Sequence, residues 1–182
     1  MPADKSASYR RRVREIAVER GLDPDIMERQ IGFESNWDPR AVSKSGAKGL
    51  GQFIPTTGAQ YGLKGGGFFD VEKSLQAHGK YMQYLYRKFG NYPQALVGYH
   101  SGPYSSDVKA VAEGRFSDMG PDAQKYIDTI VPDHRASFAK KKVAGMTGGL
   151  NTVGPLLYKG DEKSTTDIIK NAIENFLTGY DK

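Results

Sequence analysis

The sequence predicts a mainly α-helical protein, with one compact domain followed by a C-terminal linker and an amphipathic helix. Apolar residues recur at three- and four-residue steps in several segments, which is the period of a helix that is buried along one face. The alternation of apolar and polar residues that is typical of strands is nearly absent. The 182 residues suffice for one domain of about 150 residues and an appendage. Because the chain contains 0 cysteines, a disulfide framework, a thiolate metal site and a cysteine nucleophile are excluded.

Two helices are expected at the N-terminal end of the domain. The first spans residues 8–20, and Gly21 is well placed as its C-terminal cap. The second covers residues 23–34 and opens with an aspartate as N-cap and a proline in the first turn. Residues 36–53 are rich in Gly, Ser and Lys, and this composition indicates a loop.

A long helix is expected at the centre of the chain. A short helix over residues 55–62 and a flexible glycine stretch at 64–67 precede it. Asp70 can cap the long helix, which should end at Gly90. Its apolar stripe consists of Val71, Leu75, His78, Met82, Leu85 and Phe89. His78 is therefore expected in the core. Three shorter helices should follow, at residues 93–99, 104–113 and 121–135.

The predicted domain covers residues 8–138. After it, the composition changes to a basic run and then to Gly, Thr and Asn with a proline, which indicates a linker over residues 139–163. Ser164 and Asp167 have the spacing of a capping box, with Asp in place of the usual Glu, at the start of an amphipathic helix over residues 164–180. That helix needs a surface to cover, on the domain, on another copy or on part of a longer protein.

The chain is mildly basic, with 26 Lys and Arg against 21 Asp and Glu and a formal net charge of +5. This balance suits nucleic acid or an anionic polymer such as cell-wall glycan that carries carboxylated peptides. The basic clusters at residues 10–14 and 140–142 lack interleaved aromatics, so we expect solvated helix faces and no nucleic-acid partner. Residues 1–8 lack the apolar core of a secretory signal, and no integral membrane segment is expected.

A carboxyl group stands on the apolar face of the second predicted helix. Met27, Ile31 and Glu34 lie at positions i, i+4 and i+7 and therefore share one face. Glu34 also lies in the last turn, where the helix dipole disfavours an anion. Desolvation and the dipole both raise the pKa of a carboxyl group, and a carboxyl that is protonated near neutrality can act as a general acid. The alternative is that the helix frays at Gly32 and Glu34 turns outward into water.

The residues around Glu34 form the first of four ordered motifs. The motifs are ESNWDP at residues 34–39, GAKGLGQF at 46–53, GYHSG at 98–102 and YI at 126–127. Their order and spacing resemble those of the soluble lytic transglycosylase family, over residues 13–138. The resemblance implies a lysozyme-like α-helical domain without metal or cofactor. It also implies cleavage of peptidoglycan strands between N-acetylmuramic acid and N-acetylglucosamine, with formation of 1,6-anhydro ends.

The resemblance assigns roles to individual residues of this chain. Glu34 matches the family's single catalytic acid and base. Ser43 and Gln52 match residues that hydrogen-bond the glycan. Tyr99 matches a residue that lines the cleft beside the acid, and Tyr126 matches one that contacts the acid. The family pattern requires no second carboxyl group, because the substrate provides its own nucleophile.

Two positions depart from the family pattern, His100, where Asn is usual, and Gly51, where a larger apolar residue is common. We place His100 among the substrate-binding residues. Three interpretations stay open, namely a donor in place of the amide, a second proton carrier, or a histidine whose partners lie under the next loop. Trp37 is equally compatible with a sugar platform and with a core anchor.

The order of motifs also resembles the N-terminal wall-degrading domain of internal virion proteins from short-tailed phages, with EGRFS at residues 113–117 ahead of Tyr126. This implies a virion protein that acts in the host periplasm or cell envelope without a secretion signal, with other virion or ejection proteins as partners. The alternatives are a hydrolytic lysozyme or endolysin of the same fold, a bacterial enzyme with another export route, and a noncatalytic virion structural or glycan-binding module.

Overall fold

The computed structural model describes residues 5–136 and residue 139. Its helices and 3₁₀ turns are, in chain order, α1 (Lys5–Glu19), α2 (Pro24–Ser35), α3 (Pro55–Gln60), η1 (Gly65–Phe68), α4 (Val71–Phe89), α5 (Tyr92–Ser101), α6 (Ser106–Glu113), η2 (Phe116–Asp118) and α7 (Pro121–Ile130). Within the described residues no strand forms, and the only β pairing is two isolated bridges, from Lys48 to Val42 and to Phe53. The predicted fold class is therefore confirmed.

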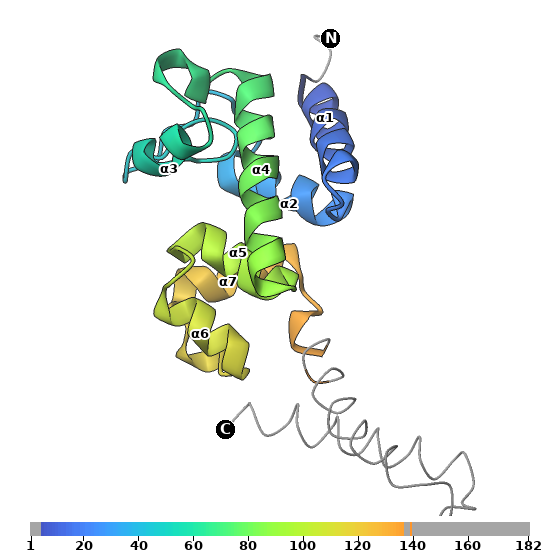
Figure 1. Ribbon diagram of the computed structural model, residues 1–182, viewed down its shortest axis with the longest axis vertical. Helices are drawn as coiled ribbons and strands as arrows, with labels where there is room; N and C mark the ends of the chain where they lie inside the picture. The colour runs from blue at the N-terminus through green and yellow to red at the C-terminus, as the bar shows by residue number, and fades with distance from the viewer. Residues whose placement is uncertain (1–4, 137–138, 140–182) are drawn as a thin grey trace, which may run out of the picture.

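Helix α4 lies at the centre of the domain (Figure 1). Helix α1 runs beside it on one side, while α5, α6 and α7 gather at its C-terminal end (Figure 1). The predicted stripe of α4 is confirmed, because Leu75, His78, Met82 and Leu85 are fully buried. Its two end members, Val71 and Phe89, are partly buried and pack against the same core. The long helix thus connects the α1 side of the domain to the α5–α7 side.

Predicted capping residues set the ends of α2 and α4. The Asp23 side chain accepts hydrogen bonds from the N–H groups of the first turn of α2, including that of Ile26. The Asp70 side chain accepts a hydrogen bond from the Lys73 N–H over 2.9 Å. Gly90 ends α4 with φ of 70°, a left-handed conformation that glycine adopts without steric cost. The boundaries of the longest helix are therefore where its sequence signals place them.

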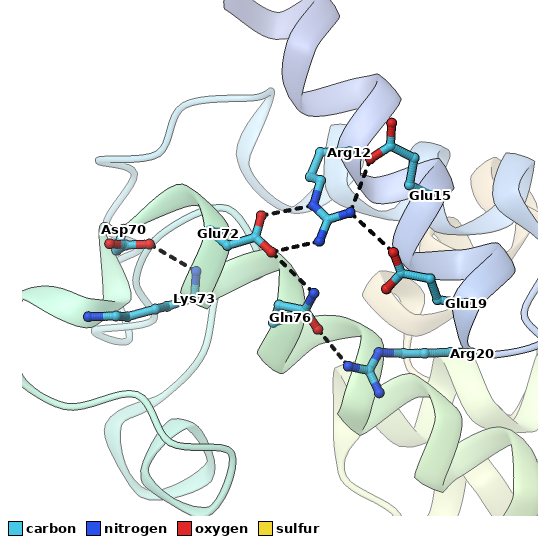
Figure 2. Close-up of polar contacts among 8 residues, drawn as sticks. All are labelled: Arg12, Glu15, Glu19, Arg20, Asp70, Glu72, Lys73 and Gln76. Carbon is cyan, nitrogen blue, oxygen red and sulfur yellow. Dashed lines mark hydrogen bonds and ion pairs between the residues drawn. The ribbon is translucent and has the colours of Figure 1, made fainter.

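The arginines of α1 lie on a solvated face, as predicted, and three of the four are paired with acids. Arg12 donates to both carboxylate oxygens of Glu72 on α4, over 2.8 and 2.9 Å (Figure 2). It also donates to Glu15 and Glu19 on its own helix, over 3.0 and 3.3 Å (Figure 2). Solvated pairs of this kind each contribute about 1 kcal/mol or less to stability. Their larger effect is that they offset most of the positive charge of this face.

One predicted helix boundary is wrong. The helix predicted over residues 121–135 ends at the C-terminus of α7, because Pro132 lacks an N–H group and disfavours helical backbone at Val131. Val131 accordingly has φ of −132° and ψ of 71°. The glycine stretch at residues 64–67 takes part in the 3₁₀ turn η1, next to the buried ring of Phe68, and its flexibility stays a prediction.

Trp37 is a core anchor, and the alternative of a sugar platform is wrong. Its side chain is buried beside α2, where a Cβ at Gly32 would lie 3.2 Å from the indole Nε1. The guanidinium group of Arg10 lies 4.5 Å from the centre of the indole ring, so α1 covers it from outside. Trp37 therefore joins the end of α2 to α1.

The basic run at residues 140–142 and the predicted helix over residues 164–180 lie outside the described residues. So does the predicted linker over residues 139–163, apart from Ala139. The boundaries of the predicted domain likewise stay predictions. Among the residues that the structure describes, no helix is both long and apolar enough to cross a membrane.

Candidate active site

A cavity of about 500 Å³ is lined by residues from the end of α2, the loop before α3, and helices α4 and α5. Five of the six predicted site residues line this cavity, namely Glu34, Ser43, Gln52, Tyr99 and His100. The sixth, Tyr126, comes from α7 and is hydrogen-bonded to Glu34. The fold therefore brings together all of the residues that the motifs single out.

Glu34 is the one acidic side chain that lines this cavity, as far as the described residues go. Helix α2 continues through Ser35, and the Asn36 N–H donates to the Gly32 carbonyl oxygen over 2.9 Å, so the alternative of a helix that frays at Gly32 is wrong. Burial raises the pKa of Glu34 to about 7, because the carboxylate form loses its hydration. A carboxyl group with this pKa is protonated in roughly half of the molecules at neutral pH, as a general acid requires.

Tyr126 and Gln30 hold the Glu34 carboxyl group in place. The Tyr126 Oη donates a hydrogen bond of 2.5 Å to Glu34 Oε1, and Gln30 Nε2 donates to the same phenol oxygen over 3.0 Å. Because the phenol has a single hydrogen, the amide donor on one side leaves that hydrogen for Glu34 on the other. This bond stabilises the carboxylate and lowers the pKa of Glu34, against the larger effect of burial. Because Oε1 accepts from Tyr126, the proton of a neutral Glu34 carboxyl group lies on Oε2.

The loop between α2 and α3 positions Ser43 and Gln52. Gly49 turns this loop with φ of +73°, and a Cβ there would lie 1.8 Å from the carbonyl oxygen of Phe68, so the position requires glycine. Gln52 Nε2 donates to two loop carbonyl oxygens, over 2.9 and 3.2 Å, which leaves its amide oxygen for a ligand. Ser43 Oγ accepts a hydrogen bond from the Ala47 N–H over 3.0 Å. Both side chains are therefore fixed by the loop that presents them.

Tyr99 forms an aromatic wall of the cavity. Its hydroxyl donates to the Gly51 carbonyl oxygen over 2.6 Å, and its ring contacts those of Phe53 and Tyr81. A Cβ at Gly51 would lie 2.8 Å from the Phe53 ring and 3.1 Å from the Tyr99 hydroxyl. The space beside Gly51 is thus filled by aromatic side chains. His78 packs against Tyr99, and burial lowers the pKa of His78 to about 3, so it is a neutral core residue as expected.

His100 stacks on Tyr126, with ring centroids 4.7 Å apart and planes inclined by 25°. Burial lowers the pKa of His100, and the negative charges of Asp122 and Asp107 partly oppose that effect. A neutral imidazole on the cavity wall presents one N–H donor and one nitrogen acceptor. This geometry favours the interpretation of His100 as a donor in place of an amide.

Gln30 is a site residue that the motifs do not single out. It lies four residues before Glu34 on α2, and its side chain is fully buried. The signal in the sequence that could have identified Gln30 is its position as a polar residue on the buried face of a helix. Its partner Tyr126, however, is 96 positions away in the chain, and helical periodicity carries no information on such a contact.

The other acids near Glu34 in sequence have structural roles. Asp38 Oδ1 accepts a hydrogen bond from the Arg40 N–H over 2.8 Å, and Asp70 caps α4. Across residues 5–136 and 139, no group of three or more His, Asp or Glu side chains is arranged to hold a metal ion. Within the described chain, the chemistry of the cavity therefore centres on one carboxyl group.

Comparison with known proteins places these features in a family. The sequence profile of the transglycosylase SLT domain matches residues 12–117. Membrane-bound lytic murein transglycosylase F from Stutzerimonas stutzeri is 30% identical over 129 residues, which are 66% of this chain and 25% of that protein. The X-ray structure of an inactive mutant of lytic transglycosylase Slt from Pseudomonas aeruginosa matches with a TM-score of 0.55 and 19% identity, over 79% of this chain and 25% of the other.

This chain spans about a quarter of the length of both of these proteins. The likeness to Slt establishes a shared fold, the lysozyme-like α-helical domain that the sequence predicts.

The hydrogen bond from Tyr126 to Glu34 lowers the pKa of the acid. Replacing Tyr126 by Phe removes a donor that stabilises the carboxylate, so the pKa of Glu34 rises further above its ordinary value. The protonated acid then persists to higher pH, and the alkaline limb of the pH profile of kcat/KM moves upward. Turbidity loss of purified cell wall, measured across the pH range, gives this limb.

Tyr99→Phe is the matched control, because the Tyr99 hydroxyl donates to a backbone carbonyl oxygen and not to Glu34. Its alkaline limb should stay in place. If the limb of Tyr126→Phe moves downward or stays unchanged, Tyr126 does not stabilise the Glu34 carboxylate.

Proposed function

The chain belongs to the transglycosylase SLT domain family, and we propose that it is a lytic transglycosylase that cleaves peptidoglycan between N-acetylmuramic acid and N-acetylglucosamine. The observation that carries this proposal is the carboxyl group of Glu34. It is the single carboxyl group among the described residues that line the cavity, and its pKa is about 7. A hydrolase with two catalytic carboxyl groups needs a second one at about 5 to 9.5 Å from the first. Among the described cavity residues, Glu34 has no such partner.

In the first step, protonated Glu34 gives its proton to the oxygen that links the two sugars. The bond from this oxygen to C1 of the muramyl ring breaks, and N-acetylglucosamine leaves as the free alcohol. The muramyl acetamido group stabilises the positive charge at C1. Glu34 becomes a carboxylate in this step, and the hydrogen bond from Tyr126 stabilises that form.

In the second step, the Glu34 carboxylate acts as a base toward the same muramyl ring. It takes the proton of the 6-hydroxyl group, whose oxygen forms a bond to C1. One C–O bond has then broken and one has formed, no water is consumed, and Glu34 is protonated again. The product carries a 1,6-anhydro end, and the reaction requires neither a metal nor a cofactor.

The remaining cavity residues bind the strand in this proposal. The Gln52 amide oxygen and the Ser43 hydroxyl hydrogen-bond hydroxyl and acetamido groups of the sugars. Tyr99 offers an aromatic face for a sugar ring beside the acid. His100 donates a hydrogen bond to the strand from its neutral imidazole.

We further propose that the chain is a phage virion protein that opens the host wall locally during genome ejection, together with other virion proteins. Its support is the resemblance of the region that leads to Tyr126. Immunodetection in purified phage particles tests this placement. Recovery of the chain from the host envelope in the absence of particles would contradict it.

Removal of the acid tests the proposed chemistry. Glu34→Gln keeps the shape of the side chain but has no proton to transfer, and general acid catalysis contributes about 10² to 10⁴-fold to rate. We expect this variant to lose at least about a hundredfold in release of fragments from purified sacculi. Mass spectrometry of the wild-type digest should find fragments one water lighter than hydrolysis products.

Asp38→Asn is the control, because Asp38 is exposed and lies outside the cavity. Its activity should be close to that of the wild type. Near-native turnover by Glu34→Gln would exclude Glu34 as the acid. Reducing muramyl ends from the wild type would instead identify a hydrolytic lysozyme, and binding without any fragments would identify a noncatalytic module.

A further inference from the structure

Positive charge is distributed unevenly over the described surface. On α1, Arg10 and Arg14 both pair with Glu28, and Arg12 is enclosed by three glutamates (Figure 2). By contrast, the sequence from Lys73 to Ser106 contains no Asp or Glu. The C-terminal half of α4, which lies within this segment, therefore carries cations that have no acidic neighbours along the chain.

Three of these cations line one hollow on the surface of α4, which we call the basic hollow. It has a volume of about 360 Å³ and is lined by Lys80, Gln83, Tyr84, Arg87 and Lys88. No carboxylate of the described residues pairs with any of the three cations. All three side chains are exposed, and so is Tyr84.

Favourable interaction with the dipole of α4 does not explain the whole hollow. Arg87 and Lys88 lie in the last turn, where cations stabilise the negative end of the helix. Lys80 lies more than two turns before that end, beyond the reach of this effect. Its place beside the other two cations points to a ligand with spaced negative charges.

Aromatic contacts link the surroundings of the basic hollow to the catalytic cavity. Tyr81 lines the cavity, and its ring stacks on that of Tyr84 in the hollow, with planes inclined by 14°. In addition, Pro103 lines the cavity, and the next residue, Tyr104, has its ring centre 4.6 Å from the Lys88 ammonium. Two aromatic contacts thus connect the cavity to the hollow.

We propose that the basic hollow binds the carboxylates of the peptides that the glycan strand carries. This inference rests on the proposed function, because the strand in the cavity places its own peptides near the adjoining surface. The three cations are spread along the helix, which suits several carboxylates on one peptide better than a single compact anion. The exposed rings of Tyr84 and Tyr104 offer apolar contact to the peptide between those charges.

Binding to sacculi with and without free carboxylates tests this site. The triple variant Lys80→Gln, Arg87→Gln, Lys88→Gln is compared with its parent by co-sedimentation, both carrying Glu34→Gln so that the wall stays intact. One batch of sacculi is native, and in the other the peptide carboxylates are amidated with carbodiimide and ammonia. We expect the triple variant to bind native sacculi about fivefold more weakly at low salt. Amidation should weaken the parent to the same extent and leave the triple variant unchanged.

The charge-matched control is Arg11→Gln, Lys64→Gln, Lys109→Gln, which changes three exposed residues outside the catalytic cavity and the basic hollow. It should bind like the parent, and circular dichroism should show that both triple variants are folded. Equal binding of the parent and the basic-hollow variant to native sacculi would overturn the proposal. It would also be overturned if amidation of the sacculi weakened binding of the basic-hollow variant as much as binding of the parent. Release of fragments from sacculi is measured separately, with the chain that carries Glu34. If fragments are released but the basic-hollow variant binds like its parent, this proposal alone is overturned. If the basic-hollow variant binds more weakly but no fragments are released, the proposed function alone is overturned.

Discussion

To act as the proposed general acid, Glu34 needs a buried carboxyl group without a cation beside it, and the packing around the end of α2 provides this environment. Met27 and Ile31 seat one face of α2 in the core, which carries Glu34 to the cavity on the same face. The neighbour that contacts its carboxyl group is a neutral phenol, Tyr126, and not a lysine or arginine. A cation at this position would hold the pKa of the carboxyl group low and leave no proton to donate.

The basic side chains of the described domain lie away from the cavity that holds Glu34. Three of the four arginines of α1 are paired with acids of α1, α2 and α4, on the outer face and away from the cavity. The unpaired cations of α4 lie beyond the aromatic side chains Tyr81 and Tyr84, outside the cavity. The acid thus remains in a cavity that no lysine or arginine of the described residues lines, and the unpaired positive charge lies in the basic hollow.

Local sequence signals predicted the helices and the catalytic candidate. They carry no information on contacts between distant segments of the chain. Asp70 and Gly90 set both ends of α4, because capping depends on residues within one turn. The position of Glu34 on a buried face followed from a spacing of three and four residues. The buried state of Trp37 depended instead on α1, and the support of Tyr126 by Gln30 joins α2 to α7. The end of α7 precedes the predicted one because Pro132 disfavours helical backbone at Val131, while the apolar period continues beyond it.

The protonation of Glu34 can be measured directly by an NMR titration of its carboxyl carbon, assigned by comparison with the spectrum of the Gln variant. Burial without a cation gives a midpoint near 7 in the free protein. A midpoint near the ordinary value of 4.5, in the free protein and with a glycan strand bound, would show a hydrated carboxylate and would leave the cavity without a proton donor.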